Sequence, residues 1–179
     1  PGVRWNYSTL DTQLISGIMQ YATGSPLADY AREKLLTPLG VRHIEWTSDG
    51  AGTTIAGQNL KMRTQDLAKL GLLYLHNGKW DGVQLVPANW VQASLTPQNR
   101  PAYFPPTDET LNLEWYGYHW YTWKGEWFGG YRSVQASGYG GQQVLVFPEL
   151  DLILVTTTNL EGVNVQQSQE QASTIGGLF

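Results

Sequence analysis

The chain has 179 residues, 41% of them apolar and 15% charged, with a formal net charge of −4. This length and apolar content suffice for one domain with a hydrophobic core, and the charge content is too low for a disordered chain. The 11 Lys and Arg residues are scattered, and no apolar run reaches the length of a membrane span, so neither nucleic acid nor a membrane span is expected. The absence of Cys excludes disulfide and thiolate chemistry, and the three His lack metal-ligand spacing, so no metal or cofactor is expected.

The chain opens with a predicted helix. Apolar residues recur at helical spacing over residues 10–22, Ser8 or Thr9 can cap the start, and Gly24 can end the helix. Tyr7 therefore lies just before a helix start, from which a side chain can project into a cleft. The alternative is a buried tyrosine whose hydroxyl bonds to the backbone.

Three more helices and their connections follow. One begins at the Ser-Pro pair of residues 25–26 and stops before Pro38. A polar loop at 47–57 leads to the strongest helical pattern, which starts at 64–66 and stops at an Asn-Gly pair. A turn and a short extended piece then precede a helix that begins at Pro87.

The second half of the chain predicts a sheet. A proline-rich loop at 96–112 is followed by a period-two pattern at 115–123, which indicates a strand. Two β-branched apolar runs at 143–148 and 152–158 predict an antiparallel hairpin, and residues 163–179 have the spacing of a terminal helix. Helices, then at least three or four antiparallel strands, then a helix indicate an α+β fold.

A glycine cluster stands where this sheet begins, at residues 135–142. Gly138, Gly140 and Gly141 permit positive φ and close approach of another group to the backbone. They form either a plain bend or one wall of a substrate cleft. The chain also has eight Trp and ten Tyr, many of them between 103 and 139, which favour an aromatic core, an aromatic-walled cleft, or both.

The sequence contains no complete set of catalytic residues. There is no Gly-x-Ser-x-Gly, no phosphate loop, no carboxylate pair at helical spacing and no Ser-x-x-Lys. The residues three positions before the five lysines are Ala31, Gln58, Asp66, His76 and Tyr121.

Several segments together nevertheless carry a resemblance. In order and spacing they resemble the C-terminal half of the serine β-lactamase-like hydrolases, the group of class C β-lactamases, D-aminopeptidases, esterases and amide-oligomer hydrolases. The segments are residues 7–18, 62–75 with 77–80, 86–91, 116–120, and 137–142 through 151. The resemblance implies an antiparallel sheet flanked by helices. Residues 1–179 would be the C-terminal part of one such domain, with 1–112 mainly helical and 113–179 holding strands and a terminal helix.

The resemblance also implies roles for residues near the start of the chain. The family's nucleophile is the Ser of Ser-x-x-Lys on an upstream helix, which this chain does not include. Tyr7 matches the tyrosine that, together with that Lys, takes the proton from the Ser hydroxyl and passes it to the leaving group. The family's usual Tyr-x-Asn ends here in Thr9, which lacks an amide and so leaves contacts of that Asn open.

Further roles fall on the glycine cluster. Ala136 stands where relatives carry the cation of Lys-Thr-Gly or His-x-Gly, which argues against tight binding of a β-lactam carboxylate. Ser137 and Gly138 would line the cleft that binds the substrate. A backbone N–H near Tyr139 or Gly140 would supply half of an oxyanion hole.

Two hypotheses follow. In the first, the parent protein is a serine hydrolase that cleaves an ester or amide through an acyl-enzyme, rather than β-lactams preferentially. In the second, the chain is a non-catalytic fragment or binding module of the same fold, inactive alone. Both expect a complementing N-terminal segment or chain, which in the first carries the Ser-x-x-Lys. The resemblance favours a periplasmic or secreted location, and the sequence itself does not fix the compartment.

Overall fold

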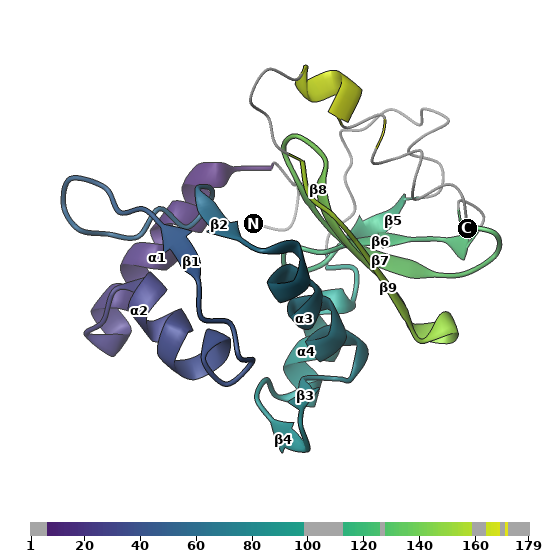
Figure 1. Ribbon diagram of the computed structural model, residues 1–179, viewed down its shortest axis with the longest axis horizontal. Helices are drawn as coiled ribbons and strands as arrows, with labels where there is room; N and C mark the ends of the chain where they lie inside the picture. The colour runs from purple at the N-terminus through teal and green to yellow at the C-terminus, as the bar shows by residue number, and fades with distance from the viewer. Residues whose placement is uncertain (1–6, 99–112, 126–127, 159–163, 169–170, 172–179) are drawn as a thin grey trace. The chain divides into compact units, whose positions relative to one another are not determined.

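The computed structural model describes residues 7–98, 113–125, 128–158, 164–168 and 171. These residues form two compact units, one over residues 7–66 and the other from residue 67 onward (Figure 1).

The first unit opens with α1, Thr9–Thr23. Ser8 has extended backbone and its hydroxyl accepts from the Asp11 N–H at 3.3 Å, so it is the N-cap. Gly24 has φ of 69° and ends the helix in the left-handed conformation. The predicted helix and both of its boundaries are confirmed.

The second predicted helix is present in two pieces. α2, Leu27–Ala31, continues into a π-helical turn, Arg32–Leu36. Beyond it, β1 (Ile44–Trp46) pairs antiparallel with β2 (Leu60–Met62), and these two strands flank the predicted polar loop. Neither strand was predicted, because each reads apolar-polar-apolar over only three residues, which is too short for an alternating pattern to indicate a strand.

The next elements agree with the sequence pattern. α3, Thr64–Leu75, is the strongest predicted helix, and it gives way to a turn in which Asn77 and Gly78 have φ of 52° and 80°. The predicted turn that follows joins β3 (Lys79–Trp80) to β4 (Val83–Gln84) as a small hairpin. α4, Ala88–Leu95, then begins after Pro87, as expected.

The remaining described strands form one antiparallel sheet in the order β5-β6-β7-β8-β9. Their bounds are β5 Leu113–Tyr116, β6 Tyr121–Trp123, β7 Ser133–Gly138, β8 Gln142–Phe147 and β9 Leu152–Thr156. The predicted hairpin of two apolar runs is β8 and β9, which pair in register from Phe147↔Leu152 to Gln143↔Thr156. The α+β expectation is therefore confirmed. Most of the predicted loop at 96–112 and of the terminal helix at 163–179 lies outside the described residues.

One strand prediction was wrong. Residues 115–123 are not a single strand: a turn at 117–120 separates β5 from β6. Gly117 is required there, because a Cβ would lie 2.0 Å from the Ser94 carbonyl oxygen, and the Tyr118 N–H donates to that same oxygen at 3.0 Å. The run of aromatic residues resembles one alternating strand, and no Asn, Asp or Pro marks the turn.

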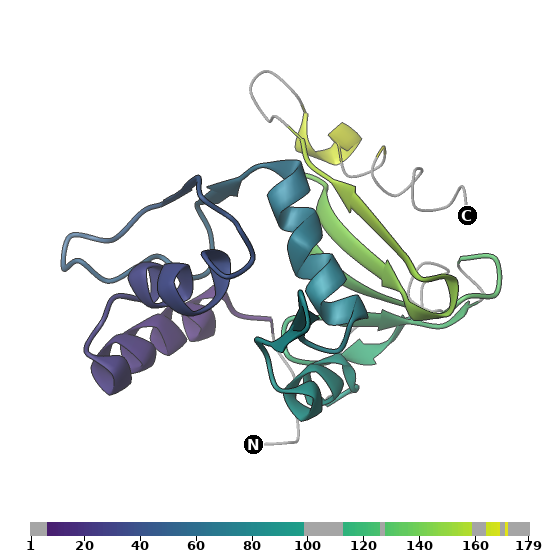
Figure 2. The same cartoon turned by 60° about the horizontal axis from the view of Figure 1, so that its bottom comes forward.

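The sheet is packed on both faces. On one face, Val144 and Val146 of β8 form a cluster with Trp120, against which side chains of α3 and α4 pack. Figures 1 and 2 show these two helices beside the sheet. On the other face, Leu145 and Phe147 pack with Phe128. A strand buried on both faces has a continuous apolar sequence, which is why β8 reads as an unbroken run.

His119 occupies a strained position in the turn between β5 and β6. Its φ is 64°, and its 3.5 Å contact with the Tyr116 hydroxyl is long for a hydrogen bond. Left-handed backbone costs a non-glycine residue roughly 1–2 kcal/mol. Glycine adopts this conformation without strain. Its greater conformational entropy in the unfolded chain, however, lowers the free energy of unfolding by about 0.5–1 kcal/mol.

We therefore expect His119→Gly to raise the free energy of unfolding by up to about 1 kcal/mol, measured by urea denaturation. His43→Gly is the matched control. His43 is exposed and has no positive φ, so its replacement should only lower stability. Equal losses in both variants would contradict the assignment of strain to His119.

Candidate active site

Tyr7 stands directly before the N-cap of α1. The residue is 57% exposed. The sequence expectation that Tyr7 precedes a helix start is confirmed, and the alternative of a buried tyrosine is wrong. Its role as a general base stays a prediction.

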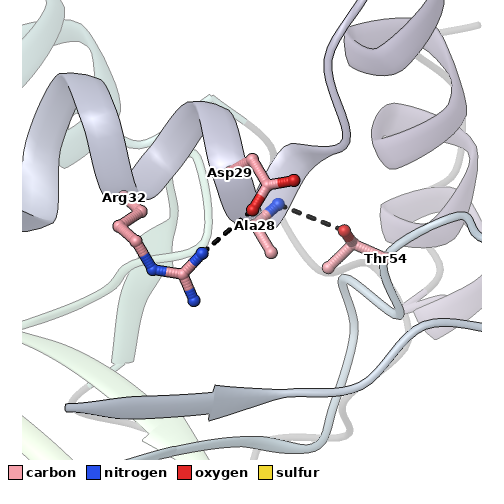
Figure 3. A network of polar contacts seen from close by, with 4 residues as sticks. All are labelled: Ala28, Asp29, Arg32 and Thr54. Atoms are coloured by element: carbon pink, nitrogen blue, oxygen red, sulfur yellow. Dashed lines mark hydrogen bonds and ion pairs between the residues drawn. The ribbon is translucent and has the colours of Figure 1, made fainter.

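Thr54 fastens the helix that follows Tyr7. This residue is fully buried, and its carbonyl oxygen accepts from the Ser16 hydroxyl at 2.7 Å and from the Gln13 side-chain amide at 3.1 Å. Its own hydroxyl accepts from the Ala28 N–H at 3.1 Å, at the start of α2 (Figure 3). One residue therefore holds both helices, and it satisfies an N–H that the helix itself leaves unpaired.

The loop that carries Thr54 is itself well bonded. The Asp49 carboxylate accepts from the Ala51 and Thr53 N–H groups, both at 2.9 Å, and the Trp46 indole donates to the Ile55 carbonyl at 2.8 Å. In contrast, the Arg32–Asp29 pair beside it, at 2.9 Å, is half-exposed or more and adds little. The polar sequence at 47–57 thus builds a fixed support for α1.

Thr9, the third residue of the tyrosine motif, has a packing role in this chain. A Cβ built on Gly57 would lie 2.4 Å from the Thr9 Cγ2 and 3.2 Å from its carbonyl oxygen. Only a glycine at position 57 leaves room for the threonine methyl group at the start of α1. No local pattern indicates this contact, since the two residues lie far apart along the chain.

The second group of predicted site residues is brought together at the β7–β8 hairpin. Ser137 and Gly138 end β7, opposite Gln143 and Gln142, and both are exposed. Tyr139, 78% exposed, and Gly140, with φ of 100°, form the turn with Gly141. The predicted glycine bend is confirmed, and its role as a cleft wall stays a prediction.

Two further bonds fix the turn. The Gly141 N–H donates to the Gly138 carbonyl at 3.3 Å, and the Thr156 hydroxyl donates to the Gly141 carbonyl at 2.7 Å. The second bond attaches the hairpin to β9. The N–H groups of Tyr139 and Gly140, the predicted oxyanion donors, therefore belong to a turn whose backbone is held from two sides.

Ala136 lies on the sheet face that packs with the helices. It joins the cluster of Trp120, Val144 and Val146, whereas its neighbour Ser137 lies on the opposite face. The position to which the family resemblance assigns the cation of relatives therefore holds, in this chain, a small apolar side chain that packs against the core cluster.

Within the described ranges, no three His, Asp or Glu side chains are grouped so that they could hold a metal ion. No helix in the part of the chain that the structure describes is long and apolar enough to cross a membrane. Tyr7 belongs to the 7–66 unit and the hairpin residues to the other unit, so their pairing in one site remains a prediction.

An antiparallel sheet with helices packed on its face is the architecture of the β-lactamase and transpeptidase-like proteins. The family model described as Beta-lactamase matches residues 1–173, and the chain belongs to that family. The resemblance inferred from the sequence is thereby confirmed. A comparison with curated proteins gave no significant match.

Several solved structures are similar. A Bacillus anthracis protein named as a 6-aminohexanoate-dimer hydrolase is 21% identical with a TM-score of 0.74, over 98% of this chain and 44% of its own. A Mycobacterium bovis β-lactamase is 20% identical with a TM-score of 0.69, over 98% of this chain and 64% of its own. A Bacillus halodurans penicillin-binding protein is 16% identical with a TM-score of 0.70, over the whole of this chain and 58% of its own. The chain thus spans about half to two thirds of these structures, and the likeness establishes the fold.

Proposed function

We propose that these residues belong to a serine hydrolase that cleaves an ester or amide through an acyl-enzyme. The observation that carries the proposal is Tyr7, which is exposed directly before α1 in a chain that the β-lactamase family model matches over residues 1–173. The nucleophile is the Ser of a Ser-x-x-Lys that the 179 residues do not contain.

In the proposed reaction, the serine Oγ attacks the substrate carbonyl carbon while Tyr7, next to the lysine ammonium, accepts the hydroxyl proton. The N–H of Tyr139 or Gly140 donates to the oxyanion that develops. Collapse of the intermediate breaks the C–O or C–N bond, and the leaving group takes the proton from Tyr7. Water then attacks the acyl carbonyl carbon while Tyr7 accepts one of its protons. The bond from that carbon to the serine Oγ breaks, and Tyr7 returns the proton to Oγ, which releases the acid and restores the serine.

The proposed substrate is not preferentially a β-lactam. Ala136 packs against the core cluster and supplies no cation for a β-lactam carboxylate, while Ser137 next to it is exposed and can hydrogen-bond a neutral group. The amide dimer named for the Bacillus anthracis structure is a substrate of the class proposed here.

A non-catalytic role is the second candidate. These 179 residues by themselves hold no Ser-x-x-Lys and so cannot form the acyl-enzyme, and a parent protein that lacks the motif elsewhere as well would favour this role. In this case the protein would be a binding module of the β-lactamase fold.

Covalent labelling by a fluorophosphonate probe distinguishes the serine hydrolase from the binding module. In the protein isolated from its source, we expect covalent labelling of a serine outside residues 1–179, and loss of labelling when that serine is replaced by Ala. The 179-residue chain alone should remain unlabelled. No labelling of the isolated protein, or labelling that survives the replacement, would refute the hydrolase and favour the binding module.

A further inference from the structure

The turn between β7 and β8 contains two consecutive glycines with positive φ, 100° at Gly140 and 87° at Gly141. Glycine adopts such angles at no steric cost, but it also has more backbone freedom than any other residue. The composition of the turn therefore permits this conformation without enforcing it. The restraint has to come from bonds to neighbouring parts of the sheet.

A hydroxyl group of β9 provides one of these bonds. The Thr156 Oγ1 donates to the Gly141 carbonyl oxygen at 2.7 Å, the usual length for a hydroxyl donor. Thr156 is the last residue of β9 and pairs with Gln143 of β8, so the ladder between these two strands fixes its position. The turn is thus attached to a third strand, which takes no part in the β7–β8 hairpin itself.

The same bond restrains the peptide group between Gly138 and Tyr139. The Gly141 N–H donates to the Gly138 carbonyl at 3.3 Å, which is long for a backbone hydrogen bond, so this contact depends on the placement of Gly141. The Gly138 carbonyl and the Tyr139 N–H belong to one planar trans peptide group and point in opposite directions. Because the carbonyl points across the turn, the Tyr139 N–H points out of it.

The Tyr139 N–H has no acceptor among the described residues. β6 pairs with β7 only over residues 133–135, so residues 136–138 have a described partner strand on the β8 side alone. An N–H that is fixed in direction and has no partner is suited to the negative charge that develops on a carbonyl oxygen under attack.

We propose that Thr156 is a positioning residue for the oxyanion hole: it holds the turn so that the Tyr139 N–H donates to the oxygen of the attacked carbonyl. The inference rests on the proposed function, since an oxyanion forms only when an ester or amide is attacked. It deepens that function in two ways, because it assigns the donor to Tyr139 rather than Gly140 and adds a residue of β9 to the site. Thr156 acts through the turn and is not itself a catalytic residue.

Thr156→Val tests this role, because valine keeps the shape of the side chain and removes only the hydroxyl. Loss of an oxyanion donor costs about 10²–10³-fold in rate, whereas here the donor stays and only its direction relaxes. We therefore expect single-turnover acylation of the full-length protein by an activated ester to slow by about 10–10²-fold. The fall should appear in the maximal rate and not in the ester concentration that gives half of it, because the bond strengthens only toward the transition state.

A thionoester with the same acyl group identifies the oxyanion as the cause. Sulfur is a weak hydrogen-bond acceptor, so the oxyanion hole accelerates the thionoester far less than the ester. The ratio of the two acylation rates, ester over thionoester, should therefore fall by about tenfold or more in Thr156→Val. A general loss of structure would slow both substrates equally, and an unchanged ratio would overturn the inference.

Two further variants separate positioning from stability. Thr156→Ser retains the hydroxyl and should restore most of the rate and of the ratio. Ile153→Val is the matched control on the same strand: its side chain packs against the cluster of Trp120, Val144 and Val146, away from the chemistry. It should lower the melting temperature, as a lost buried methylene does, and leave the acylation rate unchanged. A Thr156→Ser variant as slow as Thr156→Val would contradict the role of the hydroxyl.

Hydrogen exchange at the Gly141 amide gives a readout that needs no substrate. It should be faster in Thr156→Val than in the unmodified protein and in Ile153→Val, because the turn has lost its bond to β9. Unchanged exchange would overturn the inference. If the unmodified protein acylates and Thr156→Val acylates equally fast, the inference fails and the proposed function stands. If the unmodified protein is not acylated at all, the proposed function fails, and the inference fails with it.

Discussion

Replacing Tyr7 by phenylalanine should slow acylation by about 10²–10⁴-fold, the usual contribution of a positioned general base. The change removes one oxygen from a residue that is 57% exposed and leaves the rest of the side chain in place. The measurement is the rate of single-turnover acylation by an activated ester, in the protein isolated from its source. Unfolding curves of both proteins should superimpose within about 0.5 kcal/mol, as expected for surface substitutions.

Tyr21→Phe is the matched control for this experiment. Tyr21 lies on the same helix, is 93% exposed and loses the same hydroxyl, but it has no proposed part in the chemistry. Its acylation rate should match that of the unmodified protein. A Tyr7→Phe variant that acylates as fast as Tyr21→Phe would remove Tyr7 from the mechanism, whatever the nucleophile proves to be.

Most of the fold could be predicted from local patterns in the sequence. α1 and α3 were predictable because helical spacing, caps and terminal glycines are contained within one segment, as for Ser8 and Gly24. The β8–β9 hairpin was predictable for the same reason, since both apolar runs and the turn lie within the single segment 142–156.

Elements that depend on contacts between residues far apart in the sequence were not predicted. The turn at Gly117 depends on the carbonyl of Ser94, and nothing in the aromatic run around it records that contact. β1 and β2 are too short for a period to appear, and they pair across the whole 47–57 loop. The packing of Thr9 against Gly57 has the same origin.

In the candidate site, too, some features could be predicted from local sequence and others depend on distant contacts. The position of Tyr7 before a helix and the bend of residues 138–141 followed from local sequence. The support of α1 did not, because the bonds from Thr54 join residues 41, 38 and 26 positions apart. The roles of the site residues came from the family resemblance and not from any pattern within the chain.

Thr54→Val should lower the free energy of unfolding by about 1 kcal/mol, the net contribution of one hydrogen bond, because the donor is only part-buried. The substitution keeps the shape of the fully buried side chain and removes only the hydroxyl that accepts from the Ala28 N–H. The loss should be visible in urea denaturation and as faster hydrogen exchange at the Ala28 amide. Thr54→Ser retains the hydroxyl and should lose less, with the Ala28 amide still protected.

Two comparisons test whether the lost stability comes from the hydrogen bond between Ala28 and Thr54 or from a disturbance of the loop. Thr53→Val makes the same change one residue earlier, where the backbone N–H and carbonyl of Thr53 bond to Asp49, so the free energy of unfolding should stay nearly unchanged. Ser16→Ala removes one of two donors to the Thr54 carbonyl and should cost about 1 kcal/mol, because Gln13 still donates there. If Thr54→Val and Thr53→Val were equally stable, Thr54 would not be the residue that fastens α2. Because valine keeps the carbonyl that holds α1, Thr54→Val should lose stability while acylation through Tyr7 continues at the unmodified rate in the folded protein.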